Sequence, residues 1–211
     1  MTKVDLKKLD SYKAKPGQFT VLEVPPLQYL MIDGHGDPNS SAEYADALGA
    51  LFPLAWGLKF ASKNALGRDY VVPPLEGLWW ADDMSVFTGA RDKTAWRWTM
   101  LILTPDWITA DLVEETREAV RPKPTVSTTA LDKLRLETLD EGLCVQTLHI
   151  GSFEAETPVL EDLHDRFIPE NGLAMTGKHH EVYLSDIRKV SPDTYRTILR
   201  QPVERVATEG S

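Results

Sequence analysis

The clearest candidate for chemistry in this sequence is an acidic residue between two aromatic rings. In the segment GKHHEVYLSD (177–186), His179, Glu181 and Tyr183 occupy every second position. A β-strand points successive side chains to opposite faces, so one face would carry an imidazole, a carboxylate and a phenol. A carboxylate that faces a cavity loses hydration, and it then either attracts a cationic ligand or serves as a base. A solvent-exposed strand face explains the same pattern equally well.

The histidines do not form a metal-binding pattern. His179 and His180 are adjacent, and adjacent strand residues face apart, so they are not expected to chelate one ion. His35 and His149 are isolated in the sequence, which is typical of structural histidines. The segment IDGHGD (32–37) contains G-x-G but lacks the rest of a dinucleotide fingerprint, and its aspartates would repel a phosphate. We therefore expect no metal and no cofactor.

The tryptophans are unevenly distributed. All six lie between positions 56 and 107, so the second half of the chain has none. A hydrophobic core needs bulk in both halves, and the clustering therefore favours a cavity for a flat apolar ligand. Strand alternation places Glu76 and Trp80 on one face of a predicted strand, and Trp98 lies on the next. An aromatic core without a ligand is the alternative interpretation.

Composition and charge exclude several classes of function. The 211 residues are 42% hydrophobic and 26% charged, which is typical of a folded globular protein. A net charge of −9 repels phosphate, so we expect no nucleic-acid partner. The lone Cys144 excludes an internal disulfide and fits a reducing compartment. Since no signal-peptide core and no membrane-spanning run are present, we expect a cytoplasmic protein with no membrane partner.

The order of predicted elements repeats along the chain. The Lys-rich first 18 residues predict a loosely attached arm. In the first half, strands are predicted at 19–24, 26–32, 69–80 and 94–103, with a helix from about 40 to 61. A second helix, capped by Thr109, should end before Pro122, and 121–125 should form a linker. In the second half, strands are predicted at 134–139, 143–150, 179–184 and 194–200, with a helix from 157.

Each half therefore contains strand, helix, strand, strand. We interpret this as a duplicated βαββ unit in an α+β protein, with one domain over 1–211. Repeat one is predicted at about 19–104, a connecting helix and linker at 105–130, and repeat two at about 134–203. Glu76 and Glu181 occupy matching places, and pseudo-two-fold packing of the repeats would bring both carboxylates near the axis.

Six motifs together resemble one known family. They are LMIDGHGDPN (30–39), VVPPLEGLWW (71–80), WTMLILTPDWI (98–108), ALDKLR (130–135), EGLCVQTLHIG (141–151) and GKHHEVYLSD (177–186). In these motifs the chain is similar to the GyrI-like small-molecule-binding proteins, and it looks closest to their stand-alone branch. The resemblance covers about residues 4 to 203. It implies two βαββ units packed into one pseudo-symmetric domain with a central cleft.

The resemblance also implies a function for the acidic strand. In drug-sensing regulators of the family, an acidic residue at this motif position meets cationic aromatic ligands. Some stand-alone members look like hydrolases that open the cyclopropane of DNA-alkylating natural products. Carried onto this chain, Glu181 would be the base that activates water, with Tyr183 nearby. The residues that would shape the ligand pocket are Tyr70, Glu76, Trp80, Trp98 and His179.

Three functions stay open from the sequence. The protein could sequester flat, hydrophobic, often cationic small molecules, as in multidrug binding. It could hydrolyse strained electrophilic rings in the same cleft, which would be a detoxifying activity. It could instead modulate gyrase through a protein-interaction surface, a function that needs an exposed acidic face and no deep pocket. The oligomeric state is left open as well.

Overall fold

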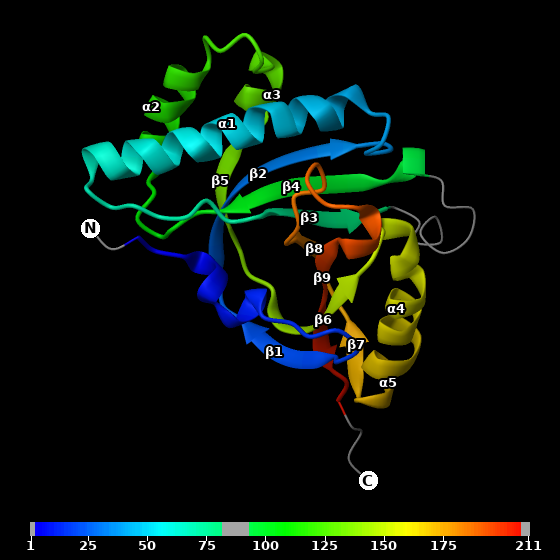
Figure 1. Ribbon diagram of the computed structural model, residues 1–211. Helices are drawn as coiled ribbons and strands as arrows, with labels where there is room; N and C mark the ends of the chain where they lie inside the picture. The colour runs from blue at the N-terminus through cyan, green and yellow to red at the C-terminus, as the bar shows by residue number, and fades with distance from the viewer. Residues whose placement is uncertain (1–2, 82–92, 208–211) are drawn as a thin grey trace. The chain divides into compact units, whose positions relative to one another are not determined.

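The protein is a mixed structure of helices and antiparallel strands, which confirms the predicted α+β class. The computed structural model describes residues 3–81 and 93–207 (Figure 1). The chain divides into two compact units. The first comprises Met1–Lys8 and Leu27–Leu139, and the second comprises Leu9–Pro26 and Asp140–Ser211.

The first unit contains four antiparallel strands in the order β3-β4-β2-β5. Their bounds are β2 (Leu27–His35), β3 (Leu75–Trp80), β4 (Arg97–Leu103) and β5 (Arg135–Leu139). The predicted strand 69–80 is shorter in the structure, because β3 begins only after Pro73-Pro74. Proline lacks the N–H that a strand ladder requires, so the segment before it cannot continue the strand. Tyr70 makes only an isolated bridge with Val4.

Helix α1 (Ala42–Ala65) runs along the sheet of the first unit, in cyan in Figure 1. The Ser41 hydroxyl accepts a hydrogen bond from the Tyr44 backbone N–H at 3.3 Å and so caps the helix, close to the predicted helix start at about residue 40. The buried residues of the helix are Ala47, Ala50, Leu51, Leu54, Ala55, Leu58, Lys59 and Ser62. Their spacing of three and four residues forms one apolar stripe against the sheet.

Helices α2 (Ala110–Val120) and α3 (Thr128–Lys133) pack on α1. Thr109 caps α2 as predicted, because its hydroxyl accepts from the Leu112 N–H at 3.2 Å. Buried Arg117 donates to the carbonyls of Leu131 and Leu134 at the end of α3. The guanidinium thus adds a donor to carbonyls at the end of the helix, where intrahelical partners run out.

The second unit contains strands in the order β1-β6-β9-β8, and β7 pairs with β9. Their bounds are β1 (Thr20–Val24), β6 (Gly142–Ile150), β7 (Leu173–Met175), β8 (His179–Tyr183) and β9 (Arg196–Arg205). The first strand of each predicted repeat therefore lies with the other repeat. β1 pairs with β6, whereas β5 pairs with β2. The single domain, the duplication and the central cleft stay predictions.

One continuous helical segment accompanies the sheet of the second unit. It consists of a 3-10 turn η5 (Phe153–Glu156), α4 (Thr157–Glu161), a π-helical stretch (Asp162–Phe167) and α5 (Ile168–Glu170). Its inner side chains form a core with the strands; the fully packed members are Val145, Leu163, Ile168, Leu173 and Val203. The π-helical stretch widens the helix where His164 is located, and such stretches are frequent at functional sites.

The predicted loose arm at the N-terminus is wrong for the residues after Leu9. Two short 3-10 helices form, at Leu6–Lys8 and Asp10–Tyr12, and Tyr12 is buried. Arg200 on β9 donates to the Ser11 carbonyl, and Gln146 on β6 donates to the Lys13 carbonyl at 3.0 Å. The many lysines of this segment suggested a loose arm. Its backbone carbonyls, however, accept hydrogen bonds from the second unit and hold the segment in place, and amino-acid composition does not reveal such bonds.

In 3–81 and 93–207, no helix is both long enough and apolar enough to cross a membrane.

Candidate functional site

Strand β8 has two chemically different faces, as the sequence predicts. His180 and Val182 are fully buried, whereas His179, Glu181 and Tyr183 are only partly covered. The covered face is occupied by a buried ion network, and the other face carries the predicted site residues.

The inward network fixes the orientation of β8. His180 Nδ1 lies 2.8 Å from Glu141 Oε1, and Arg200 Nη1 donates to Glu141 Oε2 at 2.9 Å. Burial alone would raise the pKa of Glu141, but the charges and hydrogen bonds of His180 and Arg200 lower it to about 2. Since His180 is committed to this network, it cannot join His179 around one ion.

The outer face of β8 holds a cluster of polar groups with few partners. Glu181 and His179 have side chains that are 14% and 11% exposed, and Glu181 Oε1 lies 3.5 Å from His179 Nε2. That distance allows an ion pair, yet neither ring nitrogen of His179 makes a hydrogen bond within the part of the chain that the structure describes. The ring of His164 packs edge-on against His179, with ring centroids 6.1 Å apart, and its Nε2 is likewise unpartnered among the described residues.

Aromatic rings border this polar cluster. Phe153 packs edge-on against Tyr183, with centroids 5.8 Å apart, and also contacts Tyr195 at 5.5 Å. Phe153 is 39% exposed, so an apolar surface lies at the margin of the cluster. The structure thus brings three predicted site residues, His179, Glu181 and Tyr183, together with rings that the sequence did not single out.

The most informative residue of the cluster is Glu156, which the sequence analysis missed. It ends the 3-10 turn η5 and is only 4% exposed. Burial, followed by the negative charge of Glu181, raises the pKa of Glu156 above neutral pH, against a smaller lowering by a hydrogen bond from Thr197. Its Oε1 has no hydrogen-bond partner among the described residues. Glu156 is therefore a protonated acid beside a second carboxylate.

His164 also differs from an ordinary surface histidine. Burial, reinforced by the charge of His179, lowers the pKa of His164 to about 4. The ring is therefore neutral at pH 7. Neither Glu156 nor His164 belongs to a strand with alternating polarity, and a Glu just before Thr157-Pro158 resembles an ordinary helix start. In the sequence the two residues are linked only by their spacing, since Glu156 precedes His164 by eight residues.

The predicted residues of the first unit lie on two different faces of its sheet. Glu76 and Trp80 share one face of β3, and Tyr29 Oη donates to Glu76 Oε2 at 3.5 Å. Glu76 is 1% exposed. Trp98 pairs across from Trp79, so its ring points to the opposite face, where it meets Tyr44 of α1 edge-on with ring centroids 5.1 Å apart. The structure therefore does not bring Trp98 together with Glu76 and Trp80.

Trp98 and Tyr70 are core residues of the first unit. Trp98 is fully buried, and a Cβ added to Gly34 would lie 2.1 Å from its Cη2, so the ring packs directly on the β2 backbone. Tyr70 is 1% exposed and packs edge-on against Trp107, and burial raises its pKa. Either side chain could contact a ligand only after the surrounding core moved. Their assignment to a ligand pocket stays a prediction.

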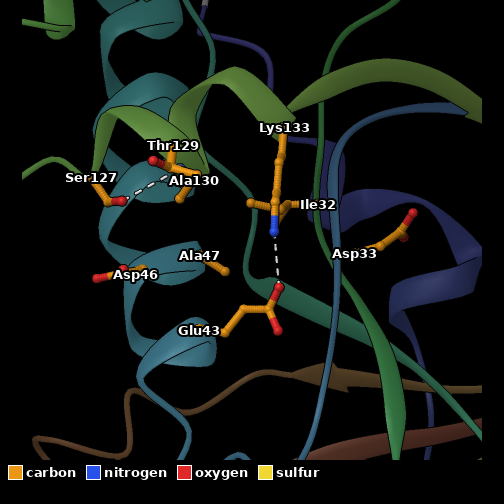
Figure 2. Close-up of a pocket in the computed structure, with 9 residues that line it drawn as sticks. All are labelled: Ile32, Asp33, Glu43, Asp46, Ala47, Ser127, Thr129, Ala130 and Lys133. Atoms are coloured by element: carbon orange, nitrogen blue, oxygen red, sulfur yellow. Dashed lines mark hydrogen bonds and ion pairs between the residues drawn. The ribbon is translucent and has the colours of Figure 1, made fainter.

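Two surface cavities lie apart from these residues. One, of about 230 Å³, is in the first unit between β2, the start of α1 and α3 (Figure 2). Its polar lining is largely satisfied, since Lys133 Nζ lies 2.9 Å from Glu43 Oε1. The other, of about 540 Å³, is in the second unit between the segment around Pro16, β6 and α4. Because neither is lined by a predicted site residue, the candidate site rests on the unpartnered polar groups rather than on cavity volume.

The same polar groups do not form a metal site. No group of three or more His, Cys, Asp or Glu side chains in residues 3–81 and 93–207 has an arrangement that could hold a metal ion.

Comparison with known proteins agrees with this fold. The model of the GyrI-like small molecule binding domain matches residues 17–204. The chain belongs to the GyrI-like family. No curated protein matches the chain.

Solved GyrI-like structures include similar proteins from Listeria innocua. An uncharacterized conserved protein of that organism is 37% identical and has a TM-score of 0.85, with 96% of this chain and 100% of the other covered. A hydrolase of Listeria innocua is 35% identical, with the same coverage and a TM-score of 0.84. The C-terminal domain of EcmrR is 13% identical over 90% of this chain and 98% of the other, with a TM-score of 0.55, and shows the common fold alone.

Proposed function

We propose that this GyrI-like protein binds small aromatic compounds, cationic ones included, against the outer face of β8, and that it hydrolyses strained electrophilic rings there. The observation that carries the proposal is the largely covered Glu181, which lies beside a histidine and an aromatic margin. Membership of a small-molecule-binding family supports the first part. The similarity to a hydrolase over the full length supports the second.

Binding of cations follows from the charge of the covered strand face. Glu181 is 14% exposed, and among the described residues the basic group in close contact with its carboxylate is His179, at 3.5 Å. A carboxylate so placed is incompletely hydrated and incompletely paired, so an aromatic cation would restore a favourable partner. Tyr183 and Phe153 supply ring surfaces on which flat ligands stack. Glu76 and Trp80 stay predicted ligand contacts of the first unit.

Hydrolysis requires a base and a water molecule. Glu181 would remove a proton from water while the oxygen attacks a ring carbon, and the strained carbon–carbon bond of a cyclopropane would break. The substrates that fit are DNA-alkylating compounds with a cyclopropane conjugated to a carbonyl. The activity would protect a cell by converting the alkylator into an unreactive alcohol.

The variant Glu181→Gln separates the possible functions. Wild type should convert a spirocyclopropyl-cyclohexadienone into its water adduct, detected by mass spectrometry, and E181Q should lose about 10²–10⁴-fold in rate. E181Q should also bind tetraphenylphosphonium more weakly, while its affinity for neutral triphenylphosphine oxide stays within about twofold. Glu161→Gln is the matched control, because Glu161 is an exposed acid of the same unit.

The outcomes are distinct. Binding without turnover in wild type would identify a sequestering protein instead of a hydrolase. Unchanged affinity and unchanged turnover in E181Q would remove Glu181 from the site. Absence of binding by wild type to either probe would leave an interaction function, such as gyrase modulation, as the better explanation.

A further inference from the structure

A second carboxyl group accompanies Glu181 and has no role in the function just proposed. Glu156 belongs to the turn η5, whereas Glu181 belongs to β8, so the two acids come from different elements of the second unit. Thr197, directly opposite Tyr183 on β9, donates a hydrogen bond to Glu156. The carboxyl group thus lies against the strand face that carries Tyr183 and Glu181.

The surroundings of Glu156 favour its neutral form. It is 4% exposed, and among the described residues the charged groups that act on it are two acids, Glu181 and, more weakly, Glu154. Two carboxylates that share a water-poor site do not both ionise readily, so one keeps a proton. Its Oε1 is buried and has no hydrogen-bond partner among the described residues, which is costly for a polar atom, so a ligand oxygen that reached it would gain a hydrogen bond.

We propose that Glu156 is the general acid of this site, complementary to Glu181 as base, and that the site therefore selects rings whose opening leaves negative charge on an oxygen. The inference rests on the proposed function, since it adds a proton donor to that reaction. A pair of carboxyl groups with one proton between them matches a reaction in which one proton is removed and another is delivered.

The proposed step balances in atoms and charge. The oxygen of water forms a bond to the ring CH₂ carbon while its proton passes to Glu181. The ring carbon–carbon bond breaks, and its electron pair moves through the conjugated dienone to the carbonyl oxygen. Glu156 delivers its proton to that oxygen, which becomes a phenol. The product is an alcohol, no oxidant or reductant is needed, and a proton then returns from Glu181 to Glu156 through solvent.

The neighbouring histidine does not supply this proton. Because burial lowers the pKa of His164 to about 4, its ring is neutral at pH 7 and has no acidic proton to give. A buried carboxylic acid is the stronger donor at that pH. Glu156 is accordingly assigned the proton-delivery role on the basis of its burial, its position beside Glu181 and its Oε1, which has no hydrogen-bond partner in residues 3–81 and 93–207.

The test is the variant Glu156→Gln, which keeps the shape and neutrality of the protonated acid but has no proton to deliver. Two ring substrates serve as probes. Opening a spirocyclopropyl-cyclohexadienone produces an oxygen anion, whereas opening a quaternary aziridinium releases a neutral tertiary amine and needs no acid. E156Q should turn over the dienone about 10²–10⁴-fold more slowly than wild type. Its rate with the aziridinium should stay within about twofold.

Binding and pH dependence provide independent readouts. The affinity of E156Q for tetraphenylphosphonium should lie within about twofold of that of wild type, since the substitution leaves the charge of Glu181 in place. The same measurement shows whether the variant is folded. Wild-type turnover of the dienone should fall as pH rises above neutral and Glu156 loses its proton, whereas the residual activity of E156Q should lack that fall. E161Q, at an exposed glutamate of the same unit that is not among the groups acting on Glu156, should match wild type in every assay.

Several results would overturn the inference. Full dienone turnover by E156Q would show that no acid is needed from this residue. Equal losses on both rings would show a general structural effect, and weakened binding of the cation by E156Q would mean that Glu156 is ionised. Failure of the proposed function can be distinguished from failure of this inference, because wild type would then open neither ring. The protonation of Glu156 has its own test: an infrared band of a carboxylic acid that is as strong in E156Q as in wild type would disprove it.

Discussion

The buried, protonated Glu156 predicts an unusual dependence of stability on pH. Because burial and the charge of Glu181 raise its pKa, the folded protein holds this proton more tightly than the unfolded chain does. The stabilisation is fully present below the unfolded pKa of Glu, about 4.3, and is lost as pH rises towards the folded pKa. Wild type should thus become less stable with increasing pH through this one group.

The expected magnitude is large enough to measure. Between the two pKa values, each pH unit lowers the free energy of unfolding by about 1.4 kcal/mol, so from pH 5 to pH 7 the loss is roughly 3 kcal/mol. Glu156→Gln has no titrating group and escapes this loss. The stability of E156Q relative to wild type should therefore rise by roughly 3 kcal/mol over the same interval.

Urea unfolding of both proteins at pH 5, 6 and 7 measures this difference. Titrating groups that do not act on Glu156, such as His164, are present in both proteins, so their contributions cancel in the comparison. The control E161Q should differ from wild type by less than about 0.5 kcal/mol at every pH. A difference between E156Q and wild type that stays constant from pH 5 to 7, or that falls, would refute the assignment of a buried neutral acid.

Two further predictions concern the framework that positions the site. Gly34→Ala should destabilise the first unit by about 1–3 kcal/mol in thermal or urea unfolding, because its Cβ would overlap the Trp98 ring. Gly49→Ala in α1, whose Cβ would be 3.7 Å from the nearest atom, should instead be neutral or stabilising by up to about 1 kcal/mol; equal losses in both variants would contradict the packing argument. Glu141→Gln should cost about 3–5 kcal/mol at pH 7, since it leaves Arg200 buried without its carboxylate. The folded pKa of Glu141 is depressed, so the difference in free energy of unfolding between wild type and E141Q should shrink as pH falls from about 4.3 towards 2. A difference that persists at pH 2 would argue against the ion network.

Local sequence patterns were sufficient to predict features that depend on residues close together in the sequence, such as strand alternation and helix caps. The two-residue period of β8 predicted that His180 and Val182 face away from His179, Glu181 and Tyr183, and the structure confirms it. Thr109 caps α2 as its side chain predicts. The N-terminal segment and the strand around Tyr70 were predicted incorrectly, because the first depends on acceptors for Arg200 and Gln146 and the second on the break at Pro73-Pro74.

The sequence alone thus determined the α+β class, the family and the acidic strand, since all three depend on periodicity or contiguous motifs. Tertiary structure decided which strands pair: β1 joins β6, and β5 joins β2, through hydrogen bonds between residues more than one hundred positions apart. It also decided that Trp98 faces α1 and that Glu156 lies beside Glu181. A side chain's burial and its charged neighbours are set by elements distant in sequence, and for this reason the second acid of the site became visible only in the folded chain.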